Sequence, residues 1–205
     1  MIKKYINEKL GDDNILIRFI ALYVLSLILF FVSWTLSYLI LPEGIIRGIG
    51  ILPNLAGEEA SESLFKEFIT IIGLNAVGWT IILIGNYILK VKNFSFGYLI
   101  PLAWMIMYGI VLGTNSFSIS IGGKTAPSLS VFGRSGIYEM MAGSLFAVST
   151  DFISSNYSKD LKTKSVPIPK NKRPKLRKKH IVGILVSFMI LIMSALREAY
   201  MIMNH

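Results

Sequence analysis

Glu139 is the residue of this sequence whose type and position point most directly to chemistry. It lies in the apolar run Gly133–Phe152, where an ionisable side chain costs roughly 2.5–3.5 kcal/mol on insertion scales and normally faces protein or water. At about 100° per residue, Gly136, Glu139 and Gly143 share one helical face, so the acid points into a close helix contact. Arg134, about one turn toward the surface, is either its ion partner or snorkels to the interface. Two roles are open for Glu139: an intramembrane proton or ion carrier, or a buried polar clamp.

The apolar run Phe68–Leu89 offers a complementary face. Its amide and small side chains fall within about 80° of one another at the helical period; they are Asn75, Gly78, Gly85 and Asn86. The next run ends in a Gly-x-x-x-Gly motif, Gly109 and Gly113, which lets two helices approach closely. We therefore expect the second, third and fourth runs to pack tightly, with Glu139 facing the amides or Arg134.

The segment Lys159–Lys179 is rich in lysine and interrupted by three prolines. Proline keeps such a chain extended and like charges favour disorder, while each cation near an anionic leaflet contributes about 1 kcal/mol. The segment is therefore either a docking site for lipid or a protein partner, or charge that only sets topology. No aromatic residues interleave with the cations, which argues against nucleic acid. The candidate docking residues are Lys170, Lys172, Arg173, Lys175, Arg177, Lys178 and Lys179.

Catalytic constellations mostly fail in this sequence. Gly133-Arg-Ser135-Gly has the G-x-S-G form of rhomboid-type intramembrane serine proteases, but the serine needs a base within reach. The two histidines are His180, expected at the opposite membrane face, and His205, the last residue. There is no cysteine, H-E-x-x-H, Walker A or Gly-rich dinucleotide loop. The sequence predicts no enzyme, no metal site and no cofactor.

The elements that position these residues are membrane helices. Of the 205 residues, 53% are hydrophobic and only 16% charged, against about a quarter charged in soluble domains. A spanning helix needs roughly 20 mostly apolar residues. We predict an all-α, polytopic membrane bundle, a single domain over residues 1–205. Its five expected spans are Ile15–Leu41, Phe68–Leu89, Phe96–Leu112, Gly133–Phe152 and Ile181–Leu196, of which the third and fifth are short enough to be re-entrant.

Loop charges predict the orientation. With the N-terminus inside, the inner segments hold 15 Lys and Arg and the outer ones 4, so the positive-inside rule places the N-terminus in the cytoplasm and the C-terminus outside. The composition favours the plasma membrane of a prokaryote. The first outer loop is acidic, and its stretch Glu58–Phe68 reads as an amphipathic helix; Glu58, Glu59 and Glu62 could hold a cation but are expected to be solvated. Solvation is also expected for Glu198. Residues 116–121 of the second outer loop alternate like a strand or belong to a mobile loop.

Three short motifs resemble the stage II sporulation protein M family of membrane proteins. They are Gly73-Leu-Asn75-Ala-Val-Gly78, Tyr108-Gly109-Ile-Val-Leu-Gly113 and Gly136-Ile-Tyr-Glu139-Met-Met-Ala142, and the resemblance covers residues 65–155. The sequence departs from the family pattern at Arg134-Ser135, which replaces a Pro-His pair, and at Ala76, which replaces a second Asn. Any proton-handling role of the family's histidine would thus be missing here.

The resemblance implies a multispan partner protein rather than an enzyme, of a kind found with engulfment machinery, ABC transporters or circular bacteriocin clusters. We expect a non-catalytic membrane subunit that scaffolds or assists an ABC-type exporter or a bacteriocin-like peptide maturation, export or immunity complex. Its expected partners are membrane lipids, other membrane subunits or an ABC transporter, and a peptide cargo. The alternative is a transporter or channel in its own right, with Glu139 as the coupling site. A hydrolase using Ser135 is the remaining rival.

Overall fold

Four long helices dominate the computed structural model, which describes residues 8–49, 63–117 and 123–203. They are α2 (Ile15–Ile40), α4 (Leu64–Ile88), α5 (Leu99–Thr114) with its preceding 3₁₀ turn η1 (Phe96–Tyr98), and α7 (Lys178–Met203). Each of the four is long and apolar enough to cross a membrane. The third and fifth apolar runs, which looked short in the sequence, thus form helical stretches of 19 and 26 residues.

Local signals set several of the helix ends. The Asn14 side chain accepts from the Leu16 N–H at the start of α2, and Ser63 accepts from Lys66 at the start of α4. Such caps satisfy amide groups that the first helical turn leaves without partners. At the end of α5, Asn115 adopts a left-handed conformation with φ of 49°, a conformation that Asn tolerates better than most residues.

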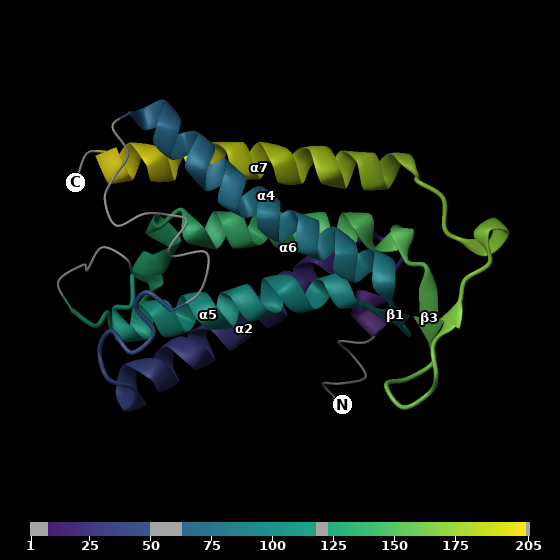
Figure 1. Cartoon of the computed structure of the whole chain (residues 1–205), viewed down its shortest axis with the longest axis horizontal. Helices are drawn as coiled ribbons and strands as arrows, with labels where there is room; N and C mark the ends of the chain where they lie inside the picture. The colour runs from purple at the N-terminus through teal and green to yellow at the C-terminus, as the bar shows by residue number, and fades with distance from the viewer. Residues whose placement is uncertain (1–7, 50–62, 118–122, 204–205) are drawn as a thin grey trace.

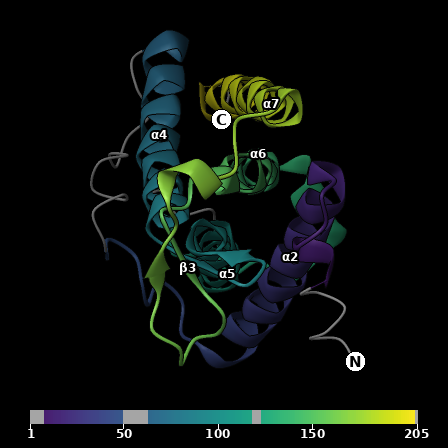
Figure 2. The same ribbon diagram turned by 90° about the vertical axis from the view of Figure 1, so that its right-hand side faces the viewer.

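The long helices run in alternating directions along one axis (Figure 1). α2 packs along α5, while α7 packs on α4 and on α6 (Gly136–Thr150). Seen end-on, α6 and α5 occupy the middle, with α4 and α2 on either side and α7 beyond α6 (Figure 2).

The fourth apolar run is the one that differs from a spanning helix. Its helix α6 has only 15 residues, flanked by the 3₁₀ turns η2 (Leu129–Gly133) and η3 (Asp151–Ile153), and 11 of the 15 are buried. At 1.5 Å per residue α6 is about 22 Å long, shorter than the roughly 30 Å hydrocarbon core. Within the described residues, four helices rather than five therefore have the length and composition of spans.

A small sheet closes one end of the bundle. Its four strands are β1 (Lys90–Val91), β2 (Phe94–Ser95), β3 (Asn156–Ser158) and β4 (Val166–Pro167), in the order β2-β1-β3-β4. β1 pairs antiparallel with β2 and parallel with β3, which ties the connection after α4 to the segment after α6. The basic segment that follows carries β4 and the 3₁₀ turn η4 (Lys170–Lys172) before α7.

The Gly-x-x-x-Gly motif of α5 packs against α2. A Cβ on Gly109 would lie 2.6 Å from the Phe30 carbonyl oxygen, and one on Gly113 would lie 2.8 Å from that of Trp34. We expected the second, third and fourth apolar runs to pack tightly on one another. The close partner of the Gly-x-x-x-Gly motif is instead α2, which forms from the first run.

The remaining glycines predicted to pack do so in different degrees. A Cβ on Gly78 would overlap the Trp104 ring, and one on Gly85 would lie 2.9 Å from the Gly97 nitrogen. A Cβ on Gly136 would come within 3.0 Å of Tyr108, whereas one on Gly143 would have ordinary contacts at 3.7 Å and beyond. α4 and α6 thus approach α5 and η1 closely at the first three positions. The predicted cation site at Glu58, Glu59 and Glu62, and most of the alternating stretch 116–121, lie outside the described residues.

Candidate functional site: a carboxyl cluster in the helix bundle

Glu139 and Asn75 meet between α6 and α4. The Asn75 amide donates to Glu139 Oε2 at 2.9 Å and, within its own helix, to the Ile71 carbonyl at 3.0 Å. Both side chains are buried, with exposed fractions of 8% and 9%. The structure thus places Glu139 against an amide, one of the two arrangements that helical spacing left open.

Two further glutamates lie in the same region, one beside Glu139 and one near the other. Glu198 of α7 is half-buried and reaches the Glu139 carboxyl within hydrogen-bonding distance, and Glu67 of α4 is buried close to Glu198. Glu139 Oε1 is buried without a separate donor. We name Glu67, Glu139 and Glu198 the carboxyl cluster. Glu198 is therefore not solvated as the sequence suggested, because α7 continues through it to Met203 and turns it toward α6.

The helix ends give the three glutamates different surroundings. Glu67 and Glu139 lie in the first turns of α4 and α6, where the helix dipole stabilises a negative charge. Glu198 lies in the second half of α7 and has no such support. A hydrogen bond between two carboxyl groups needs a proton on one of them.

Nearby arginines do not neutralise the pair. Arg134 is half-buried and forms no ion pair with Glu139, and Arg197 donates to the Gly133 carbonyl at 2.7 Å. Among the residues that the structure describes, no cation is ion-paired with Glu139 or Glu198. The pair Glu139–Glu198 therefore has no ion-paired cation within the described part of the chain.

Asn86 forms a second polar contact between α4 and α6. It is fully buried, and its amide donates to the Ala147 carbonyl and to Thr150 Oγ1, both at 2.8 Å. No carboxylate takes part. A neutral amide thus suffices to fasten these two helices to each other.

At the far end of α6, an acid is held by two cations. Asp151 Oδ2 accepts from Arg18 at 2.5 Å, from Lys90 at 2.7 Å and from the Tyr98 hydroxyl at 3.2 Å. Asp151 is only 2% exposed, and its contacts with the two cations offset the cost of burying its charge. We name Asp151, Arg18 and Lys90 the ion cluster. Nothing along the sequence indicates it, since its members come from three separate segments.

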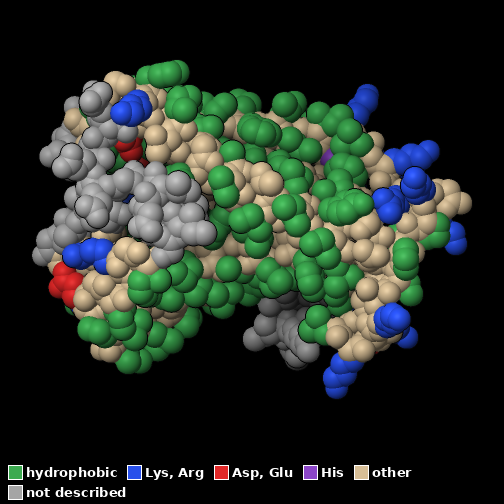
Figure 3. All heavy atoms as spheres, in the orientation of Figure 1, with side chains coloured by type: hydrophobic (Ala, Val, Ile, Leu, Met, Phe, Trp, Pro, Cys, Tyr) green, Lys and Arg blue, Asp and Glu red, His purple; other side chains and the backbone are tan. Residues whose placement is uncertain are grey.

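The predicted docking residues divide into two groups. Lys170 and Lys172 are exposed on η4, and Arg173 donates to the Ile168 carbonyl at 3.2 Å. Lys178 begins α7. The other three, Lys175, Arg177 and Lys179, line a cavity beside the ion cluster. Figure 3 shows the basic side chains gathered at this end of the molecule, with apolar side chains along its length.

Other candidates are held in place by ordinary contacts. Ser135 is buried with its hydroxyl 4.0 Å from the Met201 sulfur, while His180 stacks on Phe152 at the other end of the bundle. Asp160 is fully exposed, and hydrogen bonds from the Thr163 side chain and from the Thr163 and Lys162 backbone lower its pKa. Within the described ranges no group of three His, Cys, Asp or Glu has the geometry for a metal ion.

The four apolar helices indicate a membrane protein. Comparison with family models, with curated proteins and with solved structures finds no match. The resemblance to the stage II sporulation protein M family therefore stays a prediction that rests on three short motifs.

Proposed function

We propose that this protein is an integral membrane component of a transport system whose carboxyl cluster binds and releases a proton. The observation that carries the proposal is the contact between Glu139 and Glu198, two acids on neighbouring helices with no paired cation among the described residues. Two buried carboxylates side by side repel each other when both are charged, and a proton shared by the pair removes that repulsion. Intramembrane acids of this kind mark proton and ion pathways.

In this proposal the chain crosses the membrane five times, with its N-terminus in the cytoplasm of a prokaryote. Four helices have the required length, and α6 with its flanking turns, residues 129–153, extends the fourth crossing. Protein rather than lipid surrounds most of α6, because most of the side chains of α6 are buried. The clustering of cations at one end supports the orientation.

A purely structural clamp is the rival role for Glu139. Asn86 supplies such a clamp between the same two helices with neutral groups alone. A third acidic side chain adds repulsion to a clamp but adds capacity to a proton-binding site. The composition of the cluster therefore favours proton binding.

The test is infrared difference spectroscopy on the purified protein in lipid vesicles, titrated with pH. The carbonyl stretch of a protonated carboxyl is expected in the wild type and is expected to vanish in both Glu139→Gln and Glu198→Gln. Gln has the same shape as Glu, and at position 139 its amide oxygen still accepts from Asn75, so the fold should persist. Glu43→Gln, which changes an exposed glutamate bonded to Asn115, should keep the band.

Two results would overturn the proposal. One is a wild type without a protonated carboxyl at any pH at which it stays folded. The other is a band that survives both cluster variants. Either would leave Glu139 as a clamp.

A second candidate function is the accessory role, a non-catalytic subunit that assists an ABC-type exporter or a peptide-maturation complex. The observation in its favour is the basic turn η4, on which Lys170 and Lys172 are exposed. Affinity purification in mild detergent, with mass spectrometry of what co-elutes, tests it. Lys170→Gln/Lys172→Gln should lose the partner, and Lys175→Gln/Arg177→Gln should keep it. Recovery of the same partner by both double variants would contradict docking at η4.

A further inference from the structure

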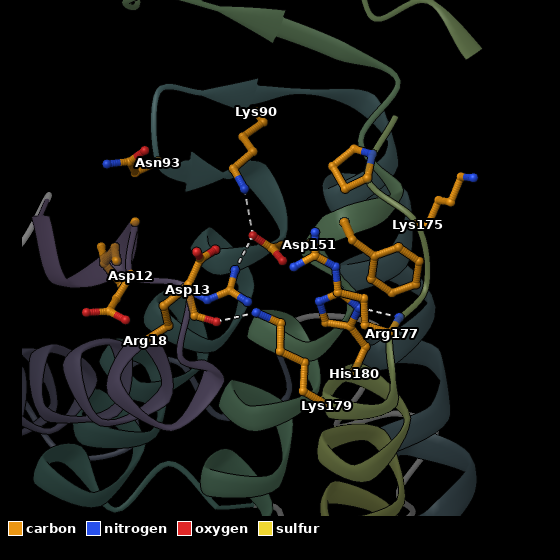
Figure 4. Close-up of a pocket in the computed structure, with 14 residues that line it drawn as sticks. Asp12, Asp13, Arg18, Lys90, Asn93, Asp151, Lys175, Arg177, Lys179 and His180 are labelled. Carbon is orange, nitrogen blue, oxygen red and sulfur yellow. Dashed lines mark hydrogen bonds and ion pairs between the residues drawn. The ribbon is translucent and has the colours of Figure 1, made fainter. Parts of the chain in front are cut away.

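A polar cavity of about 250 Å³ opens beside the ion cluster, between the start of α2, the start of α7 and the small sheet (Figure 4). Its size is just below the roughly 300–1,000 Å³ of pockets for drug-sized ligands. The cavity can therefore take one small polar group. Nothing in the proposed proton-binding function uses it.

Cations outnumber carboxylates around this cavity. Its lining includes three carboxylates, Asp12, Asp13 and Asp151, and five Lys or Arg, namely Arg18, Lys90, Lys175, Arg177 and Lys179. Asp151 is already bonded to two of these cations, and Asp12 accepts from the Asn14 backbone. The cavity therefore presents an excess of positive charge to whatever enters it.

One cation of the lining is both buried and incompletely bonded. Arg18 is only 6% exposed, and its Nη1 donates to Asp151 while its Nε is buried without a partner. A guanidinium has five N–H donors in a fixed plane that suits carboxylate or phosphate oxygens. A buried donor without a partner costs roughly 1–3 kcal/mol, so an anion that reached Arg18 would be favoured.

Two helices begin at this cavity, and their N-termini also favour an anion there. α2 starts at Ile15 and α7 at Lys178, and residues just before both helices belong to the lining. Helix N-termini carry partial positive charge and favour phosphate. His180 accepts from the Arg177 backbone through Nδ1 at 3.1 Å, which leaves the proton of its neutral ring on Nε2.

We propose that this cavity binds a phosphate group, carried either by an anionic phospholipid headgroup or by a soluble phosphate ester. A headgroup is placed well to enter, because the cavity lies where α2 and α7 begin and the exposed apolar side chains Leu16, Ile181 and Val182 follow directly along these helices. Basic pockets between membrane helices take phosphorylated headgroups in this way. A soluble ester would use the same donors from the aqueous side.

The test uses the full chain in phosphatidylcholine nanodiscs at fixed ionic strength. Two probes, inorganic phosphate and short-chain, water-soluble phosphatidic acid, are titrated by calorimetry. The key variant is Lys175→Gln/Arg177→Gln, because both side chains are exposed at the cavity and neither is ion-paired in the described chain. The matched control is Lys170→Gln/Lys172→Gln, which removes the same charge from exposed positions of the same segment outside the lining.

Wild type and control are expected to bind alike, and the key variant roughly 30-fold more weakly. Binding of phosphatidic acid alone would assign a lipid headgroup, and binding of both probes would assign a soluble ester. Circular dichroism confirms that the variants are folded. The proposal would be overturned if neither probe bound to the wild type. It would also be overturned if both double variants bound equally weakly, since general charge attraction predicts equal weakening.

Discussion

The two ends of α6 hold acids in opposite ways. Asp151, directly after the last residue of the helix, is bonded to Arg18, Lys90 and Tyr98. Glu139, in the first turn, has one neutral donor, Asn75, and lies beside another acid, Glu198. Twelve residues separate them in sequence, about 18 Å along a helix.

In the proposed function this difference separates a structural site from a proton-binding one. At the ion cluster the carboxylate is paired with two cations, and the groups hold α2, the connection after α4 and the end of α6 to one another. At the carboxyl cluster neighbouring carboxylates would repel each other if both were charged, and in the proposal a proton removes that repulsion. Packing alone does not require that arrangement, because Asn86 joins the same two helices without charge.

The largest expected effect comes from breaking the ion cluster. Asp151→Ala leaves Arg18 charged and buried, and removal of one partner from a buried ion pair costs roughly 3–5 kcal/mol. The free energy of unfolding in detergent micelles, from denaturant titration, measures it. Asp160→Ala removes the same residue type from a turn after the same helix, where the carboxylate bonds only to Lys162 and Thr163 of that turn, and should cost less. Equal losses in the two variants would mean that the ion cluster is not a structural site.

A smaller effect is expected at the carboxyl cluster when its neutral donor is removed. Asn75→Ala leaves Glu139 Oε2 buried without a hydrogen bond, at a cost of roughly 1–3 kcal/mol. Thr80→Ala, on an exposed position of the same helix, should change the free energy of unfolding by less than about 0.5 kcal/mol.

A double-mutant cycle sharpens this prediction. If the Asn75–Glu139 bond causes the loss, Asn75→Ala and Glu139→Ala, each of which removes the bond, should couple by about 0.5–3 kcal/mol. Additive effects of the two substitutions would show that Asn75 stabilises the bundle through packing instead.

Hydropathy and helical spacing predicted much of the bundle. The apolar runs located the long helices, and the 3.6-residue period placed Glu139 and Asn75 on facing surfaces, where the structure brings them together. The ends of α7 were misplaced, because Lys178 and Lys179 at its start and Arg197 and Glu198 near its end interrupt the apolar run without interrupting the helix.

Contacts between segments were beyond the reach of the sequence. A Gly-x-x-x-Gly motif fits any close partner, so nothing along the chain distinguished α2 from α4 or α6 as the neighbour of Gly109 and Gly113. The strands of the small sheet have two or three residues each, too few for an alternating pattern. The contact of Glu198 with Glu139 depends on how α7 is rotated about its axis. The contacts of Asp151 depend on how the segments after α4 and α6 pair. A single sequence specifies neither.

The smallest expected change in stability comes from Glu198→Gln, and it separates the two clusters by their response to acid. Replacing one acid of a repelling set should change the free energy of unfolding by less than about 0.5 kcal/mol. In the wild type, acid should relieve repulsion at the carboxyl cluster, and in the variant this response should shrink. Asp151 behaves oppositely: acid that protonates it breaks its ion pairs with Arg18 and Lys90, so the stability that these pairs contribute is lost as the pH falls.

Pulsed hydrogen exchange at the two ends of α6, after incubation at a series of pH values, measures both responses in one experiment. Acid should increase exchange near Asp151 in the wild type and in Glu198→Gln alike, since the substitution lies at the other end of the helix. Near Glu139 the wild type should gain protection with acid and the variant should gain less. If acid instead loosened both ends together, the carboxyl cluster would be stabilised by its charges, and the contrast between a structural and a reactive acid on the same helix would not hold.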